Sequence, residues 1–248
     1  PRYAVPVFVG AFLLFQVQPI IARCILPWFG GSPSVWTTCM LFFQILLLAG
    51  YAYSHWLIDR VKPGGQAVFH TVLIGLSLAI LAAMAVAWGA PILPSQDWKP
   101  ADSSRPVLRI IALLAVTVGL PYLVLATTSP LLQAWFSRRF PGSSPYRLYT
   151  VSNVGSILAL LSYPFLVEPL LALRAQAWVW AAGYALFGVW VVYCAIDAGR
   201  DRAAEGSGRA QERLEEADPA PGWRLKLLWV GLPALACALF LAVTNQMC

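Results

Sequence analysis

The sequence predicts an all-α fold, a polytopic transmembrane helical bundle of about seven spans. Hydrophobic residues make up 59% of the chain and charged residues only 11%, and the mean hydropathy is +0.69. A bilayer core about 30 Å thick is crossed by roughly 20 apolar residues in a helix, and backbone groups in lipid must bond within their own helix. Apolar runs of that length predict spans at 5–26, 35–58, 67–89, 107–133, 147–167, 174–196 and 225–245.

The first span could be mistaken for a cleaved signal peptide, because Arg2 precedes its apolar run. The run is too long for a signal peptide, it carries Gln16, Gln18 and Pro19, and no small-residue cleavage site follows it. We therefore expect this segment to be the first membrane span.

The fourth span is too long for a straight crossing. Pro121 removes one backbone donor and is expected to bend the helix. Beyond residue 128 we expect an amphipathic end, with Trp135 and Phe136 at the level of the lipid headgroups and Arg138 and Arg139 in the cytosol.

The spans fall into a six-span bundle over 1–196, a charged cytosolic linker over 197–223 and a seventh span over 224–248. Positions 197–218 hold 11 of the 28 charged side chains, which is typical of a solvated linker, with room for one short helix over 208–217. Six spans, a long inner linker and a further span suggest one lobe of a two-lobed transporter fold and the start of the second. The chain stops as the seventh span ends, so we expect it to be a piece of a longer protein. No sequence repeat is evident within the six spans.

The basic residues predict the orientation in the membrane. With the N-terminus inside, inner segments carry 12 Lys and Arg residues and outer segments carry 5. Cytoplasmic loops are enriched in these residues, so we expect a multi-pass protein of the inner (plasma) membrane with a cytoplasmic N-terminus. The net charge of +6 comes from these topology signals, and we expect a lipid bilayer as partner and no nucleic acid.

Polar side chains at membrane depth indicate candidate substrate-binding residues, because each is costly there without a partner or a purpose. Gln16 in the first span, Gln44 in the second, and Ser152 and Asn153 in the fifth are expected to line a polar cavity near the midplane. The alternative is that they hydrogen-bond neighbouring helices together. Beside them Ser152, Gly155 and Ala159 form a stripe of small residues that would admit a close helix crossing.

Two charged residues complete the candidate set at the outer edge. The first and fifth spans both run outward and end near Arg23 and Glu168, respectively. We expect these two side chains to form an ion pair, since each would be costly alone at the edge of the lipid. The alternative is that each reaches the outer interface separately.

The sequence offers no signal for catalysis, a cofactor or a metal ion. It has no Gly-rich phosphate loop, no nucleophile motif and no acid pair. The five cysteines show no ligand spacing and fit a packing role. His55 and His70 are both expected near the cytosolic face as structural residues, because two histidines and the nearby Asp59 are too few for a metal site.

Several long strings resemble the membrane region of bacterial spermidine synthase-like proteins, which are described as fused major-facilitator/spermidine synthase proteins. They are FLLFQVQPIIARCILPWFGGSPSVWTTCMLFFQILLLAGYAY, PLLQAWFSRRF, PYRLYTVSNVGSILALLSYPFLVEPLL and LAVTNQ. The resemblance covers most of residues 8–170 and resumes over 225–246.

The resemblance implies a membrane module that anchors a spermidine synthase-like enzyme or handles its substrate or product. In some members the membrane region is joined to a soluble aminopropyltransferase-like domain, which would bind decarboxylated S-adenosylmethionine and a polyamine and which lies outside this chain. Two alternatives stay open: a secondary transporter of the major-facilitator type for a small solute, and a structural membrane scaffold. No acidic residue lies within an expected span, and Glu168 is the one that directly borders a span at its outer end, which weakens the case for polyamine transport.

Overall fold

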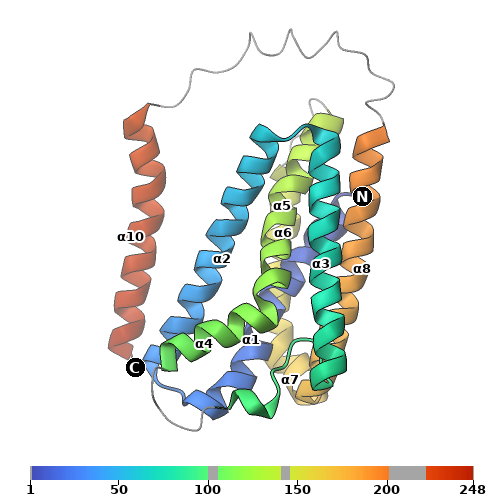
Figure 1. Ribbon diagram of the computed structural model, residues 1–248. Helices are drawn as coiled ribbons and strands as arrows, with labels where there is room; N and C mark the ends of the chain where they lie inside the picture. The colour runs from blue at the N-terminus through green and yellow to red at the C-terminus, as the bar shows by residue number, and fades with distance from the viewer. Residues whose placement is uncertain (1, 100–105, 141–145, 201–221, 248) are drawn as a thin grey trace, which may run out of the picture. The chain divides into compact units, whose positions relative to one another are not determined.

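The protein is a helical bundle in the computed structural model, which describes residues 2–99, 106–140, 146–200 and 222–247 (Figure 1). The described part is helical and contains no strand. The helices are α1 (Ala4–Phe29), α2 (Pro33–Arg60), α3 (Pro63–Trp88), η1 (Gln96–Trp98), α4 (Pro106–Leu114), η2 (Ala115–Gly119), α5 (Leu120–Arg139), α6 (Tyr146–Ser162), η3 (Tyr163–Val167), α7 (Glu168–Leu170), α8 (Leu173–Arg200) and α10 (Trp223–Met247).

Six helical segments of the described chain are long and apolar enough to cross a membrane. They cover Ala4–Phe29, Pro33–Arg60, Pro63–Trp88, Pro106–Arg139, Tyr146–Leu170 and Leu173–Asp197, so the first six expected spans are confirmed as helices of membrane length. The predicted seventh span coincides with α10, a 25-residue helix, but α10 is not among the six, and its crossing stays a prediction.

Prolines and glycines set the helix boundaries. Pro33 and Pro63 occupy the first turn of α2 and α3, where the missing N–H has no intrahelical role. Gly30 and Gly89 end α1 and α3 with positive φ angles of 83° and 72°, which residues with a Cβ rarely adopt. At the other end of the six-span bundle, α8 continues to Arg200. The expected short helix over 208–217 lies outside the described residues.

The predicted bend in the fourth span is confirmed. A π-helical turn, Ala115–Gly119, separates α4 from α5, and Pro121 is the second residue of α5. Helix α4 lies at a clear angle to α5 in Figure 1. Proline offers no N–H to the carbonyl four residues earlier, so the helix widens there by one residue. A second π-helical turn, Tyr163–Val167, contains Pro164.

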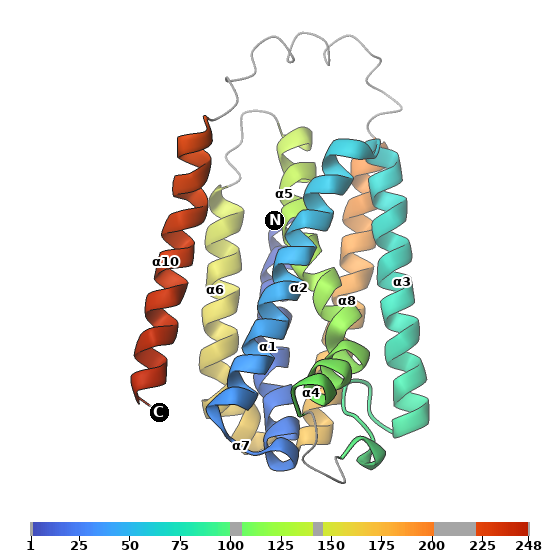
Figure 2. The same cartoon turned by 60° about the vertical axis from the view of Figure 1, so that its left-hand side comes forward.

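Helix α1 and the fourth span, Pro106–Arg139, are the two most buried spans of the six-span bundle, and Figures 1 and 2 show the long helices side by side. Helix α1 packs against α5, α6 and α8, while α2 packs against α4 and α5, and α3 packs against α5 and α8. The buried core contains α1 side chains such as Val17, Ile20 and Ile25, at 0–1% exposure. We call the face where α1 begins the first face and the face where α1 ends the second face.

Glycines allow the closest helix crossings. A Cβ added at Gly155 would lie 2.7 Å from the backbone oxygen of Phe8, so α6 touches the backbone of α1. A Cβ at Gly50 would lie 2.7 Å from the Cβ of Ala126, which brings α2 equally close to α5. The expected close crossing at the small-residue stripe is therefore present, and α1 is the helix that uses it.

Candidate functional site

A small cavity of about 100 Å³ opens between α1, α2, α5, α6 and α8. Its walls are mainly apolar and include Leu14 and Phe15 of α1 and Phe187 of α8. Five hydroxyl-bearing residues, from α2, α5 and α6, supply the polar part of the lining: Tyr51, Thr128, Ser129, Ser152 and Ser156. No charged side chain is among the lining residues that the structure describes.

The hydroxyl groups of this cavity are partly engaged with the protein itself. Ser156 donates to the carbonyl of Ser152 at 3.0 Å, and Ser129 accepts from Gln133 Nε2 at 3.3 Å. A serine hydroxyl that donates one bond keeps acceptor lone pairs, and one that accepts a bond keeps its proton to donate. The cavity can therefore hydrogen-bond a small polar group, but it has no charge with which to hold an ion.

His70 does not line the cavity but contacts Thr128, which does. The imidazole is 1% exposed, and its Nε2 lies 2.9 Å from Thr128 Oγ1. Thr128 Oγ1 lies 2.6 Å from the carbonyl of Val124, and both contacts are made together when the threonine donates to that carbonyl and His70 Nε2 carries the proton of the pair. The imidazole cannot then act as a base toward Thr128, and this arrangement offers no activated nucleophile. His70 is therefore a buried residue with a structural contact, and its expected place near the cytosolic face stays a prediction.

The structure separates the three amides expected around the cavity. Gln16 faces the interior at 4% exposure, with its Oε1 buried and without a hydrogen-bond partner among the described residues. Gln44 and Asn153 are exposed on the bundle surface, so the expectation that they face inward is wrong. The buried side of α2 contains Phe43 and Gly50, and the buried side of α6 contains Gly155. Gln44 and Asn153 lie on the other sides of these helices, which face the bundle surface. Ser152 is the one expected residue that lines the cavity.

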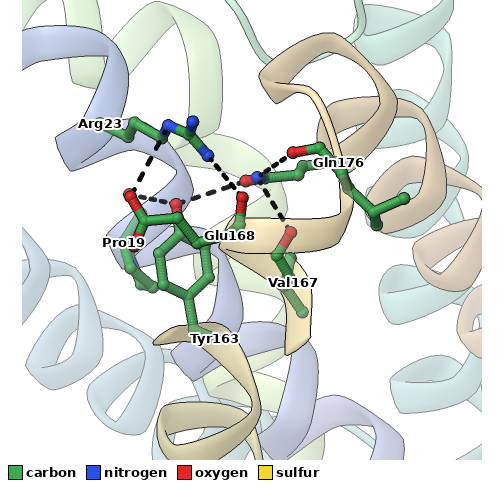
Figure 3. A network of polar contacts seen from close by, with 7 residues as sticks. Pro19, Arg23, Tyr163, Val167, Glu168 and Gln176 are labelled. Carbon is green, nitrogen blue, oxygen red and sulfur yellow. Dashed lines mark hydrogen bonds and ion pairs between the residues drawn. The ribbon is translucent and has the colours of Figure 1, made fainter. Parts of the chain in front are cut away.

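Arg23 and Glu168 come together at the second face, as expected (Figure 3). Arg23 Nε lies 3.8 Å from Glu168 Oε1, and Arg23 Nη1 donates to the Glu168 backbone oxygen at 3.3 Å. Beside them Tyr163 Oη lies 3.3 Å from both the Pro19 carbonyl and Gln176 Oε1. The ion pair belongs to a polar network that connects α1 to η3, α7 and α8. None of these residues lines the cavity.

We expect the ion pair to contribute modestly to stability. The two side chains are 38% and 47% exposed, so solvent screening limits the pair to about 0.5–1 kcal/mol. Arg23→Ala and Glu168→Ala should each lower the melting temperature in detergent, and the double variant should lose less than the sum. Strictly additive losses would show that the two side chains do not interact.

Two buried glutamines that the sequence analysis did not single out organise the helix ends. Gln66 is 0% exposed and Gln176 is 1% exposed. Gln66 Oε1 accepts from Trp135 Nε1 at 3.1 Å and from Arg138 Nη1 at 3.0 Å. Trp135 is therefore a buried residue, at 3% exposure, so it packs inside the bundle, and its expected depth at the lipid headgroups stays a prediction. Its indole N–H needed a partner inside the protein, and Gln66 supplies it.

The described residues contain no group of three or more His, Cys, Asp or Glu side chains that could hold a metal ion. His55 is exposed and pairs with Asp59 at 3.3 Å. Comparison with known proteins finds no matching family model, no matching curated protein and no matching solved structure.

Proposed function

We propose that this chain is the membrane module of a spermidine synthase-like protein, and that it anchors the enzyme or handles its substrate or product. The long strings quoted above support the link to that family, and the six helices of membrane length support the membrane role. The proposal places the module in the inner membrane with its N-terminus and first face in the cytoplasm, as the distribution of Lys and Arg suggests.

The cavity is the observation that supports handling of a solute. It is lined by hydroxyl groups from three helices. Its volume of about 100 Å³ is well below the roughly 300–1,000 Å³ of a typical ligand site. It would therefore hold one end of a solute, such as a terminal amine or hydroxyl group.

The uncharged lining favours a second candidate, a secondary transporter for a small neutral solute. Glu168 is already paired with Arg23 and does not line the cavity. A polyamine would bring two or more positive charges, and burying them without a carboxylate is costly. The expected substrate-binding roles of Gln16, Gln44, Asn153, Arg23 and Glu168 stay predictions.

Binding to the purified protein tests these candidates. If the module handles a polyamine, labelled putrescine or spermidine binds saturably, and Ser156→Leu abolishes that binding by filling the cavity. Thr150→Leu is the matched control, because Thr150 is exposed on the same helix and lies outside the lining. The transporter would be favoured if neither polyamine binds, while a neutral polyol binds saturably and Ser156→Leu removes that binding. Absence of all binding would leave a structural anchor and contradict solute handling.

A further inference from the structure

Two prolines inside the helices around the cavity each leave a backbone oxygen without its helical donor. Pro19 lies in α1 and Pro130 lies in α5. Proline has no N–H, so the carbonyl four residues earlier loses its intrahelical bond. The two carbonyls are those of Phe15 and Ala126, and both residues line the cavity. Among the residues that the structure describes, no donor from another helix reaches either oxygen.

Two hydroxyl groups of the same lining already donate their protons within the protein. Thr128 Oγ1 lies 2.6 Å from the Val124 carbonyl and 2.9 Å from His70 Nε2, and both contacts together leave it only a lone pair to offer. Ser156 Oγ donates to the Ser152 carbonyl at 3.0 Å, so it too can only accept a further bond. The lining thus contains four acceptor oxygens, two from backbone carbonyls and two from hydroxyl groups.

An excess of acceptors selects a ligand that only donates. An ammonium group has three N–H donors and no lone pair, whereas a hydroxyl group has one donor and two lone pairs. The other hydroxyl groups of the lining, those of Tyr51, Ser129 and Ser152, can rotate to accept as well. The lining that the structure describes contains no carboxylate, so the attraction comes from oxygen dipoles, which bind cations without a formal charge in potassium channels.

We propose that the cavity binds one small monovalent cation through these four oxygens, and that the cation is the ammonium end of an amine or a sodium ion. The inference rests on the solute handling proposed above and names the chemical class of the solute. The cavity holds one end of a solute, so the second charge of a diamine stays outside it. Pro19 and Pro130 are then determinants of binding, because each keeps one carbonyl free of a helical bond.

Restoring the two missing N–H groups tests the site in the full chain. Putrescine is the amine probe, and 1,4-butanediol is its neutral counterpart with the same carbon chain. We expect putrescine to bind saturably and at least about tenfold more tightly than butanediol. Pro19→Ala and Pro130→Ala should each weaken putrescine binding about tenfold, because a hydrogen bond to a charged group contributes about that factor.

Pro27→Ala is the matched control and should leave putrescine binding unchanged. Pro27 also lies inside α1, but the carbonyl that it leaves free belongs to Arg23, which does not line the cavity. Alanine is far more favourable than proline in a helix interior, so all three variants should fold, and their melting temperatures in detergent check this.

Sodium chloride and choline chloride at equal ionic strength distinguish the two cations. Weaker putrescine binding in sodium chloride assigns a sodium ion to the same site, and equal binding in both salts limits the site to the ammonium group.

Three results would overturn the cation site and leave solute handling intact. They are butanediol binding as tight as putrescine binding, unchanged putrescine affinity in both cavity variants, and equal weakening by Pro27→Ala. Absence of binding by either probe would contradict solute handling itself, and the cation site with it.

Discussion

Gln66→Met should destabilise the protein more than any other single replacement of a polar side chain discussed here. The amide is fully buried and makes four contacts, with Ile58, Val61, Trp135 and Arg138. Methionine has a similar length but can neither donate to the two carbonyls nor accept from the indole and the guanidinium. Each buried group left without a partner costs about 1–3 kcal/mol, so we expect a loss of at least about 3 kcal/mol.

Thermal unfolding in detergent measures this loss, and Gln133→Met is its matched control. Gln133 is half-buried and makes one 3.3 Å contact, with Ser129, so its replacement should cost less than about 1 kcal/mol. Comparable melting temperatures for the two variants would show that the Gln66 contacts do not stabilise the hairpin.

Gly155→Leu should be the most damaging change in the apolar packing. A Cβ at this position would already lie 2.7 Å from the Phe8 backbone oxygen and 3.4 Å from Ala11 Cβ. Backbone atoms cannot give way as a flexible side chain can, so α1 and α6 must separate. Overpacking of this kind costs about 1–3 kcal/mol, and we expect a loss at or above the upper end.

Gly75→Leu provides the comparison for this change. Gly75 lies within α3, is exposed, and has no atom within 4 Å of an added Cβ, so its replacement should leave the melting temperature unchanged or slightly raised. A Gly155→Leu variant as stable as Gly75→Leu would contradict the close crossing of α1 and α6.

Hydropathy predicted the six helices because their length is set by the bilayer and not by contacts within the protein. Pro121 predicted the break in the fourth span for an equally local reason, the missing N–H. The Arg23–Glu168 contact followed from topology, since spans one and five run the same way and end at the same face. Each of these predictions needed only the chain itself.

The polar interior was harder to predict because polarity alone does not show which side of a helix faces its neighbours. Gln44 and Asn153 were expected to face inward for their amides, yet the inward sides of their helices are set by residues that permit close packing, such as Gly50 and Gly155. In a bilayer both sides of a helix are apolar, so the hydrophobic pattern that orients a helix in water is weak.

The two buried glutamines were missed for a different reason. Gln66 and Gln176 sit near the start of their helices, where a polar residue is ordinary, and neither belongs to a polar stripe. The available signal was the recurrence of a Leu, an aliphatic residue and an acid, as LID and LVE, ahead of a Gln-Ala pair in spans 2–3 and 5–6. That pattern is short and is interrupted by turns of different length. It could be recognised only once the hydrogen bonds of the two glutamines were known.

The most direct test of the membrane account is thiol labelling of a variant without its native cysteines, carrying Asp97→Cys or Ser207→Cys. Three spans separate these positions, so they should lie on opposite sides of the membrane. An impermeant reagent should label position 97 in intact cells and position 207 only after the membrane is opened. Labelling of 207 and not 97 in intact cells would reverse the proposed orientation. Labelling of both in intact cells would contradict the six-span bundle itself.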